Sequence, residues 1–151
     1  MMNRLSVIIT AATLAASNFA LAGGPPDTVV GAARFDSAGS KVEIMAKSDA
    51  DGADATGRFR LRQGTLDVQG EVTCLSVDGN WSAAGGTIIK SDDNAFLGLF
   101  FIQMTRDNGE GRDDPDESQT AFFDNPVDCA DWVDFDPAFD VDRGNYEIKD
   151  R

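Results

Sequence analysis

The residues best suited to chemistry lie together in one acidic stretch, "DNGEGRDDPD". Its oxygen-bearing side chains are those of Asp107, Asn108, Glu110, Asp113, Asp114 and Asp116. Calcium prefers carboxylate and amide oxygens as ligands, and two carboxylates that face each other across a cleft can hydrolyse a glycosidic bond. The plainer interpretation is a turn, because Asx side chains cap the backbone and glycine accepts positive φ. We expect Asp107 and Asn108 to build a turn first and to bind metal second.

A second acidic loop, "SDADGADATG", places Asp49, Asp51 and Asp54 around Gly52. An EF-hand needs ligands at loop positions 1, 3 and 5, glycine at 6 and glutamate at 12. Here glycine falls at position 4 and no flanking helix is predicted. The loop is therefore either a solvated turn or a weak calcium candidate.

The absence of histidine from the chain excludes most catalytic centres. Ser-His-Asp and Cys-His arrangements are ruled out, and so are the common zinc sites. Phosphate-binding glycine loops of the GxxxxGK or GxGxxG type are also missing. We expect no enzyme and no cofactor other than calcium.

A row of cations, Arg58, Arg60 and Arg62, alternates with Phe59 and Leu61. In a strand, alternate residues point to the same face, so the three guanidinium groups should lie on one side. Such a row needs acidic neighbours or an anionic ligand. We expect internal partners, with the acidic loop 107–117 as the first choice.

The chain carries 26 acidic and 13 basic residues, a net charge of −13. A surface of this sign repels nucleic acid and anionic lipid, so we expect neither as a partner. Of the acids, 21 are aspartate, which favours turns over strands and helices. The acidity should therefore lie mostly in loops and serve solubility.

The first 22 residues have the pattern of a secretory signal: Arg4, an apolar run, and small residues at "ALA". This apolar run is too short to span a bilayer, and no longer one follows, so no membrane span is expected. We predict a signal peptide at 1–22 and one secreted or periplasmic domain at 23–151. Cys74 and Cys129 then form a disulfide, since an even cysteine count is typical of oxidising compartments.

Short apolar segments alternate with glycine and aspartate turns, which predicts antiparallel β-structure. The predicted strands are 29–35, 41–46, 57–62, 65–77, 81–90, 95–106, 119–123 and 145–149. About eight such strands favour a single all-β domain, either a barrel or a two-sheet sandwich. The run "FLGLFFIQM" is apolar on both alternating sets, so it is predicted as a central strand with its second face under a loop. The alternative is that one face lines a ligand cavity or a partner interface.

Several short motifs occur in order: "VTCLSVDGN", "DNGEG", "PD", a second cysteine and "RGNYEI". In this combination the chain resembles a group of uncharacterised exported bacterial all-β domains with the pattern VxCLxVxGN, DNGEG, PD, C and GNxxV. The likeness covers residues 57–149, and the two cysteines match its cysteine positions. It implies a secreted β-domain and no particular activity. Trp81 and the acidic segment 131–142 depart from the pattern.

These observations favour a non-enzymatic exported structural or interaction module, with an extracellular protein or glycan as its partner. The first alternative is a β-domain that binds calcium through loop 107–117, or a small ligand in an apolar cavity beside Phe100. The second alternative is a carboxylate-dependent glycan hydrolase.

Overall fold

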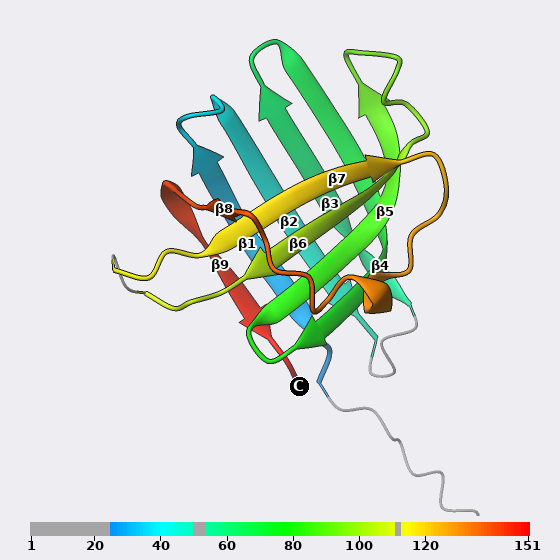
Figure 1. Ribbon diagram of the computed structural model, residues 1–151. Coiled ribbons are helices and arrows are strands. Elements are labelled where there is room, and N and C mark those ends of the chain that lie inside the picture. The colour runs from blue at the N-terminus through cyan, green and yellow to red at the C-terminus, as the bar shows by residue number, and fades with distance from the viewer. Residues whose placement is uncertain (1–24, 50–53, 111–112) are drawn as a thin grey trace, which may run out of the picture.

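The computed structural model describes residues 25–49, 54–110 and 113–151. The predicted signal peptide, residues 1–22, lies outside this part of the chain. Within these described ranges, nine strands and one three-residue 3-10 helix make up the regular structure (Figure 1). Their bounds are β1 (Thr28–Phe35), β2 (Ser40–Ser48), β3 (Ala55–Gln63), β4 (Leu66–Asp78), β5 (Trp81–Ser91), β6 (Phe100–Arg106), β7 (Glu117–Phe123), η1 (Cys129–Asp131), β8 (Phe139–Asp140) and β9 (Arg143–Lys149). Within the described ranges, no helix is long and apolar enough to cross a membrane.

The strands form one antiparallel sheet in the order β8-β7-β6-β5-β4-β3-β2-β1-β9. Strands β1 to β7 follow one another as a meander, while β9 returns to pair with β1 at the far edge. The sheet curls, so that β6 and β7 cross in front of the strands at its other end (Figure 1). The all-β prediction is confirmed, and the architecture is a curled half-barrel with one disulfide.

A two-residue hairpin turn joins β4 to β5. Asp78 pairs with Trp81, which leaves Gly79 and Asn80 as a two-residue connection. Gly79 takes φ +59°, a conformation that glycine adopts without steric cost.

The prediction of a strand over 95–106 is wrong in its first half, since β6 begins only at Phe100. The preceding segment turns back on itself: Asp93 Oδ1 accepts from the N–H of Ala95 (2.9 Å), and Phe96 N–H donates to Asp93 O (3.1 Å). Gly98 then takes φ +83°. Local capping by the aspartate and the freedom of glycine therefore outweigh the apolar pattern. The two-residue strand β8 was also missed.

Side chains on the concave face of the sheet form the main core, and they include Val29, Ile44, Phe59, Val68, Phe101 and Tyr146. At its centre Phe59 and Phe101 stack with ring centroids 4.3 Å apart. Burial of these apolar side chains is the main force that holds the curled sheet together.

A second apolar cluster lies on the convex face, where the segment around η1 covers β5 and β6. Its buried members are Ala83, Ile102, Met104, Cys129 and Val133. Strand β6 is therefore covered on both faces, with Phe101 toward the main core and Ile102 toward the covering segment. The prediction of a central strand with one face under a loop is confirmed.

Candidate functional site

The predicted site residues of the acidic stretch separate into two groups. Asp107, Asn108 and Asp116 are at least half-buried and form hydrogen bonds, whereas Glu110, Asp113 and Asp114 are exposed. Asn108 N–H donates to Asp116 Oδ1 (2.9 Å), and Asn108 Nδ2 donates to Pro115 O (2.8 Å). Asp107 Oδ1 accepts from Gly109 N–H (2.9 Å), which closes the predicted Asx turn. We refer to Asp107, Asn108, Pro115 and Asp116 as the latch.

The latch fastens the β6–β7 loop to β9. Asp116 Oδ2 accepts from the N–H of Tyr146 (2.7 Å), and Asp107 Oδ2 accepts from the N–H of Ile148 (3.2 Å). Strand β9 pairs with β1 on its other side, so these two N–H groups would otherwise lack a strand partner. Buried backbone donors need an acceptor. Two aspartate side chains thus supply the acceptors that another strand would supply.

The β4–β5 turn also joins the latch. Asn80 Nδ2 donates to Asp107 O (2.8 Å), and Asp107 N–H donates to Asn80 O (2.9 Å). The motif pieces "DGN", "DNG", "PD" and "GNYEI" therefore meet in space at one seam of the half-barrel. Asp107 and Asp116 join β9 to the β6–β7 loop, and Asn80 holds Asp107 from the other side.

The environment of Asp116 raises the pKa of its carboxyl above the ordinary 3.8. Removal from water is the largest cause, since Asp116 is only 4% exposed. The backbone N–H groups of Tyr146 and Asn108 act in the opposite direction, and the nearby acids Asp107 and Glu110 raise the pKa further. Burial of this charge is therefore offset only in part by its hydrogen bonds.

The described residues of this loop form no cluster of ligands that would support the calcium prediction. No group of three or more His, Cys, Asp or Glu side chains in the described part of the chain is placed to hold a metal ion. Both carboxylates of the latch already accept backbone hydrogen bonds. In the second loop, Asp54 N–H donates to Asp49 Oδ1 (3.3 Å), while Asp51 lies outside the described residues. Calcium binding stays a prediction at both places.

The three arginines lie on one side of β3, as predicted, and this side is the convex face of the sheet, but the prediction of their partner was wrong. Arg60 forms an ion pair with Asp67 on β4, and Arg62 forms one with Glu43 on β2 (2.9 Å). Neighbouring strands lie closer than the acidic loop 107–117, because β3 pairs with β2 and β4. Arg58 makes no ion pair with any described residue. The hydrogen bond from Arg60 lowers the pKa of Asp67, and those from Lys41 and Arg62 lower the pKa of Glu43.

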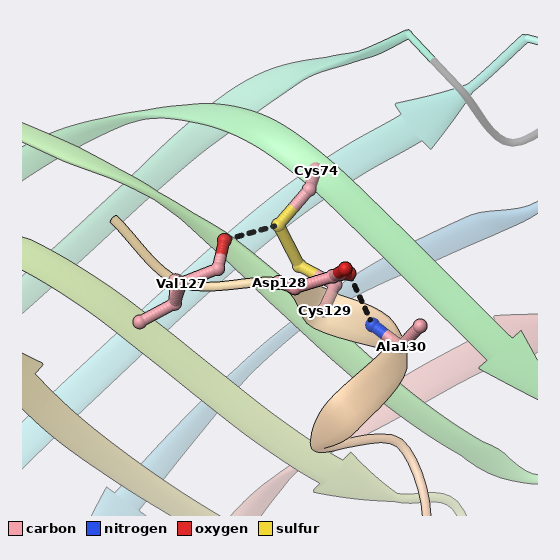
Figure 2. The surroundings of a disulfide bond; sticks show 5 residues. All are labelled: Cys74, Val127, Asp128, Cys129 and Ala130. Atoms are coloured by element: carbon pink, nitrogen blue, oxygen red, sulfur yellow. Dashed lines mark hydrogen bonds between the residues drawn. A yellow bond between two sulfur atoms is a disulfide. The ribbon is translucent and has the colours of Figure 1, made fainter. Parts of the chain in front are cut away.

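The predicted disulfide joins Cys74 on β4 to Cys129 at the start of η1, with the two Cα atoms 5.9 Å apart (Figure 2). Asp128 caps η1 by accepting from the N–H of Ala130 (3.0 Å). Gly85 lies beneath the bridge, where a Cβ would come within 3.1 Å of both sulfur atoms. The disulfide therefore holds the covering segment on the convex face, and the absence of a side chain at position 85 gives it room.

A cavity of about 450 Å³ opens at the end of the half-barrel where β7 and β8 face β2 and β3. We call it the mouth pocket. Its apolar lining is Phe35, Ala38, Val42, Leu61, Phe122, Ala138 and Phe139, and its polar lining is Ser37, Ser40, Gln63, Thr120, Asp140 and Asp142. Val42 and Leu61 continue into the main core, whereas Phe139 at the rim is 58% exposed. The pocket thus joins buried apolar side chains to solvent.

A chain of buried polar groups lies behind the mouth pocket. Thr120 Oγ1 donates to Gln103 Oε1, and Gln103 Nε2 donates to Ser118 Oγ. Ser118 Oγ lies 3.1 Å from Tyr146 Oη, and burial raises the pKa of that phenol well above its usual range. Gln103, Ser118 and Tyr146 are at most 1% exposed. Such a connected network fixes the rotamers of its members, so Thr120 is held rigidly at the pocket wall.

Sequence reasoning missed the mouth pocket. The predicted cavity was placed beside Phe100, which lies on the other side of β6 from the main core. The available signal was the alternation of Ser118, Thr120 and Phe122 along β7, which puts all three on the concave face. The predicted strand 119–123 began one residue too late to show it.

A larger groove of about 620 Å³ crosses the convex face over β2 to β5. Its lining includes Glu43, Met45, Arg58, Arg60, Glu71 and Ile89. Glu43 and Arg60 are already in ion pairs with neighbouring side chains. The groove thus combines charged side chains, two of which already have partners, with exposed apolar ones such as Met45 and Ile89.

Comparison of the chain with protein-family models, with curated proteins and with solved structures gave no match. Any functional argument therefore depends on the geometry of the chain itself.

Proposed function

We propose that the chain is a non-enzymatic exported β-domain that binds a small molecule with an apolar body in the mouth pocket. The observation that carries the proposal is the cavity of about 450 Å³ lined by Phe35, Leu61, Phe122 and Phe139. Small-molecule sites usually measure about 300–1,000 Å³, are mostly apolar, contain a few placed polar groups and occur at the mouths of β-barrels. The mouth pocket shares these properties.

Two further features support a binding role for the pocket. The polar network fixes Thr120, so one polar group is preorganised against the apolar wall. Phe139 presents an exposed aromatic ring at the rim, where it can close over a ligand without disturbing the core. Exposed aromatic side chains beside a cavity often contribute strongly to binding.

The proposal is tested by titrating the oxidised chain, residues 23–151, with the neutral molecule 4-phenylbutan-1-ol in a calorimeter. We expect saturable binding at one site. Phe139→Ala should weaken it by about tenfold, since the variant removes an aromatic contact. The matched control is Phe135→Ala, because Phe135 is also exposed (44%) but lies on the covering segment against Trp132.

The control should bind like the unaltered chain. Absence of saturable binding, or an equal loss in both variants, would overturn the proposed function. In that case the exposed ring of Phe139 contacts another protein or has no role in binding.

A further inference from the structure

The polar groups of the mouth pocket point to a particular class of ligand, and this inference rests on the proposed function. We infer that the pocket prefers a ligand with an apolar body and a protonated amine over neutral or anionic ligands of the same shape. Its basis is the distribution of hydrogen-bond acceptors and charge around the apolar wall.

Two polar side chains at the wall, Thr120 and Gln63, offer acceptors to a ligand. Thr120 uses its hydroxyl hydrogen on Gln103, so its oxygen can only accept from a ligand. The exposed side chain of Gln63 uses one Nε2 hydrogen on Ala38 O (3.2 Å), so its amide oxygen can accept from a ligand and its second Nε2 hydrogen can still donate. An ammonium group carries three donors and no acceptor, so it complements this wall.

The charges at the rim have the same preference. Asp140 and Asp142 line the pocket, and both are exposed. Among the residues that the structure describes, the lining includes no lysine or arginine. Arg143 comes next to Asp142 in sequence, but it forms an ion pair with Asp36 (3.0 Å). A carboxylate ligand would meet two negative charges without a compensating cation, whereas an ammonium would be attracted.

The aromatic rim adds a third contribution. Phe35, Phe122 and Phe139 line the pocket from three different strands. A cation held over the face of an aromatic ring is attracted to its π electrons. The same rings contact the apolar body of the ligand, so one wall accommodates both parts of an aryl or alkyl amine.

The experiment compares three molecules that share one body: 4-phenylbutylamine, 4-phenylbutan-1-ol and 4-phenylbutanoate. Calorimetry at neutral pH and low salt should give the amine a Kd about tenfold below that of the alcohol, or about 1.4 kcal/mol. The carboxylate should bind more weakly than the alcohol. Raising the salt concentration should reduce the preference for the amine, because both carboxylates at the rim are exposed.

Variants separate the pocket from the general acidity of the chain. Asp140→Asn with Asp142→Asn should bring the Kd of the amine to that of the alcohol measured with the same variant. Asp131→Asn with Asp134→Asn removes the same charge from the covering segment, and it should preserve the preference for the amine. Thermal unfolding establishes that each variant is folded.

Each outcome has a distinct meaning. If the unaltered chain binds none of the three molecules, the proposed function fails and this inference fails with it. If the alcohol binds as tightly as the amine, the inference is overturned while the proposed function stands. If both double variants lower amine affinity equally, the attraction comes from net charge alone and the inference is again overturned.

Discussion

Replacing Asp116 of the latch by alanine should lower the stability of the chain by an amount that the structure predicts. Asp116 is 4% exposed and accepts from the N–H groups of Tyr146 and Asn108. Tyr146 is fully buried, so after the substitution its N–H has no acceptor and no access to water. A buried unsatisfied donor costs about 1–3 kcal/mol. The N–H of Asn108 is only half-buried and can meet water, so it adds less.

We therefore expect Asp116→Ala to lower the free energy of unfolding by about 2 kcal/mol. The measurement is urea unfolding of the oxidised chain at neutral pH, followed by tryptophan fluorescence. Asp113→Ala is the matched control, because Asp113 is an exposed acid of the same loop and its loss should change stability by no more than about 0.5 kcal/mol.

A local measurement distinguishes the latch from a general loss of stability. Amide hydrogen exchange at Tyr146 should accelerate by more than the fall in global stability accounts for, because the Asp116 hydrogen bond protects that amide directly. The reasoning is refuted if the Asp116→Ala variant has the same free energy of unfolding as the Asp113→Ala variant and the amide of Tyr146 keeps its protection from hydrogen exchange. The Asp116 carboxylate would then not replace a strand partner.

Two further predictions concern the disulfide and the ion pairs of the convex face. The double variant Cys74→Ala with Cys129→Ala removes a disulfide between residues 55 positions apart. If the disulfide acts by restricting the unfolded chain, its loss should lower the free energy of unfolding in urea by about 4 kcal/mol. A loss below about 1 kcal/mol would contradict this explanation. The pKa of Asp67 is lowered from the ordinary 3.8, and the pKa of Glu43 is lowered from the ordinary 4.5. The ion pairs therefore contribute to stability above the ordinary pKa values, and this contribution is lost as the pH falls through the lowered pKa values of the folded chain. Between about pH 5 and pH 3, the unaltered chain should lose more stability than the double variant Asp67→Asn with Glu43→Gln, and parallel pH profiles would argue against these pairs.

Much of the fold could be predicted because its signals are local. Alternating apolar residues and two-residue turns at glycine depend on neighbours in sequence, and the disulfide follows from a count of two cysteines in a chain with a secretory pattern. The strand over 95–106 was the main failure among the strands, because Asp93 and Gly98 favour turns by local hydrogen bonding and backbone freedom. An apolar pattern alone does not show whether local turn formation or burial of the apolar side chains is the stronger effect.

The candidate site could be predicted only in part. The turn-building role of Asp107 and Asn108 follows from the residue types, but the second role of Asp107 and that of Asp116 depend on β9, some 30 to 40 residues away. The partners of Arg60 and Arg62 depend on which strands flank β3. The alternation along β7 was the one sequence signal for the mouth pocket, because the rest of its described lining comes from β1, β2, β3 and β8 and from the segments that connect strands.

By itself the sequence determined the all-β class, the disulfide, the net negative charge and the exclusion of histidine chemistry, since these follow from composition and from periodicity over a few residues. The tertiary structure decided that the sheet curls into a half-barrel, that two aspartates join its seam and that an apolar pocket with acceptor groups opens at one end. The physical reason is that curling brings distant strands within hydrogen-bonding and van der Waals distance. The whole sheet therefore decides which side chains line one cavity and which carboxylates accept from a buried N–H group.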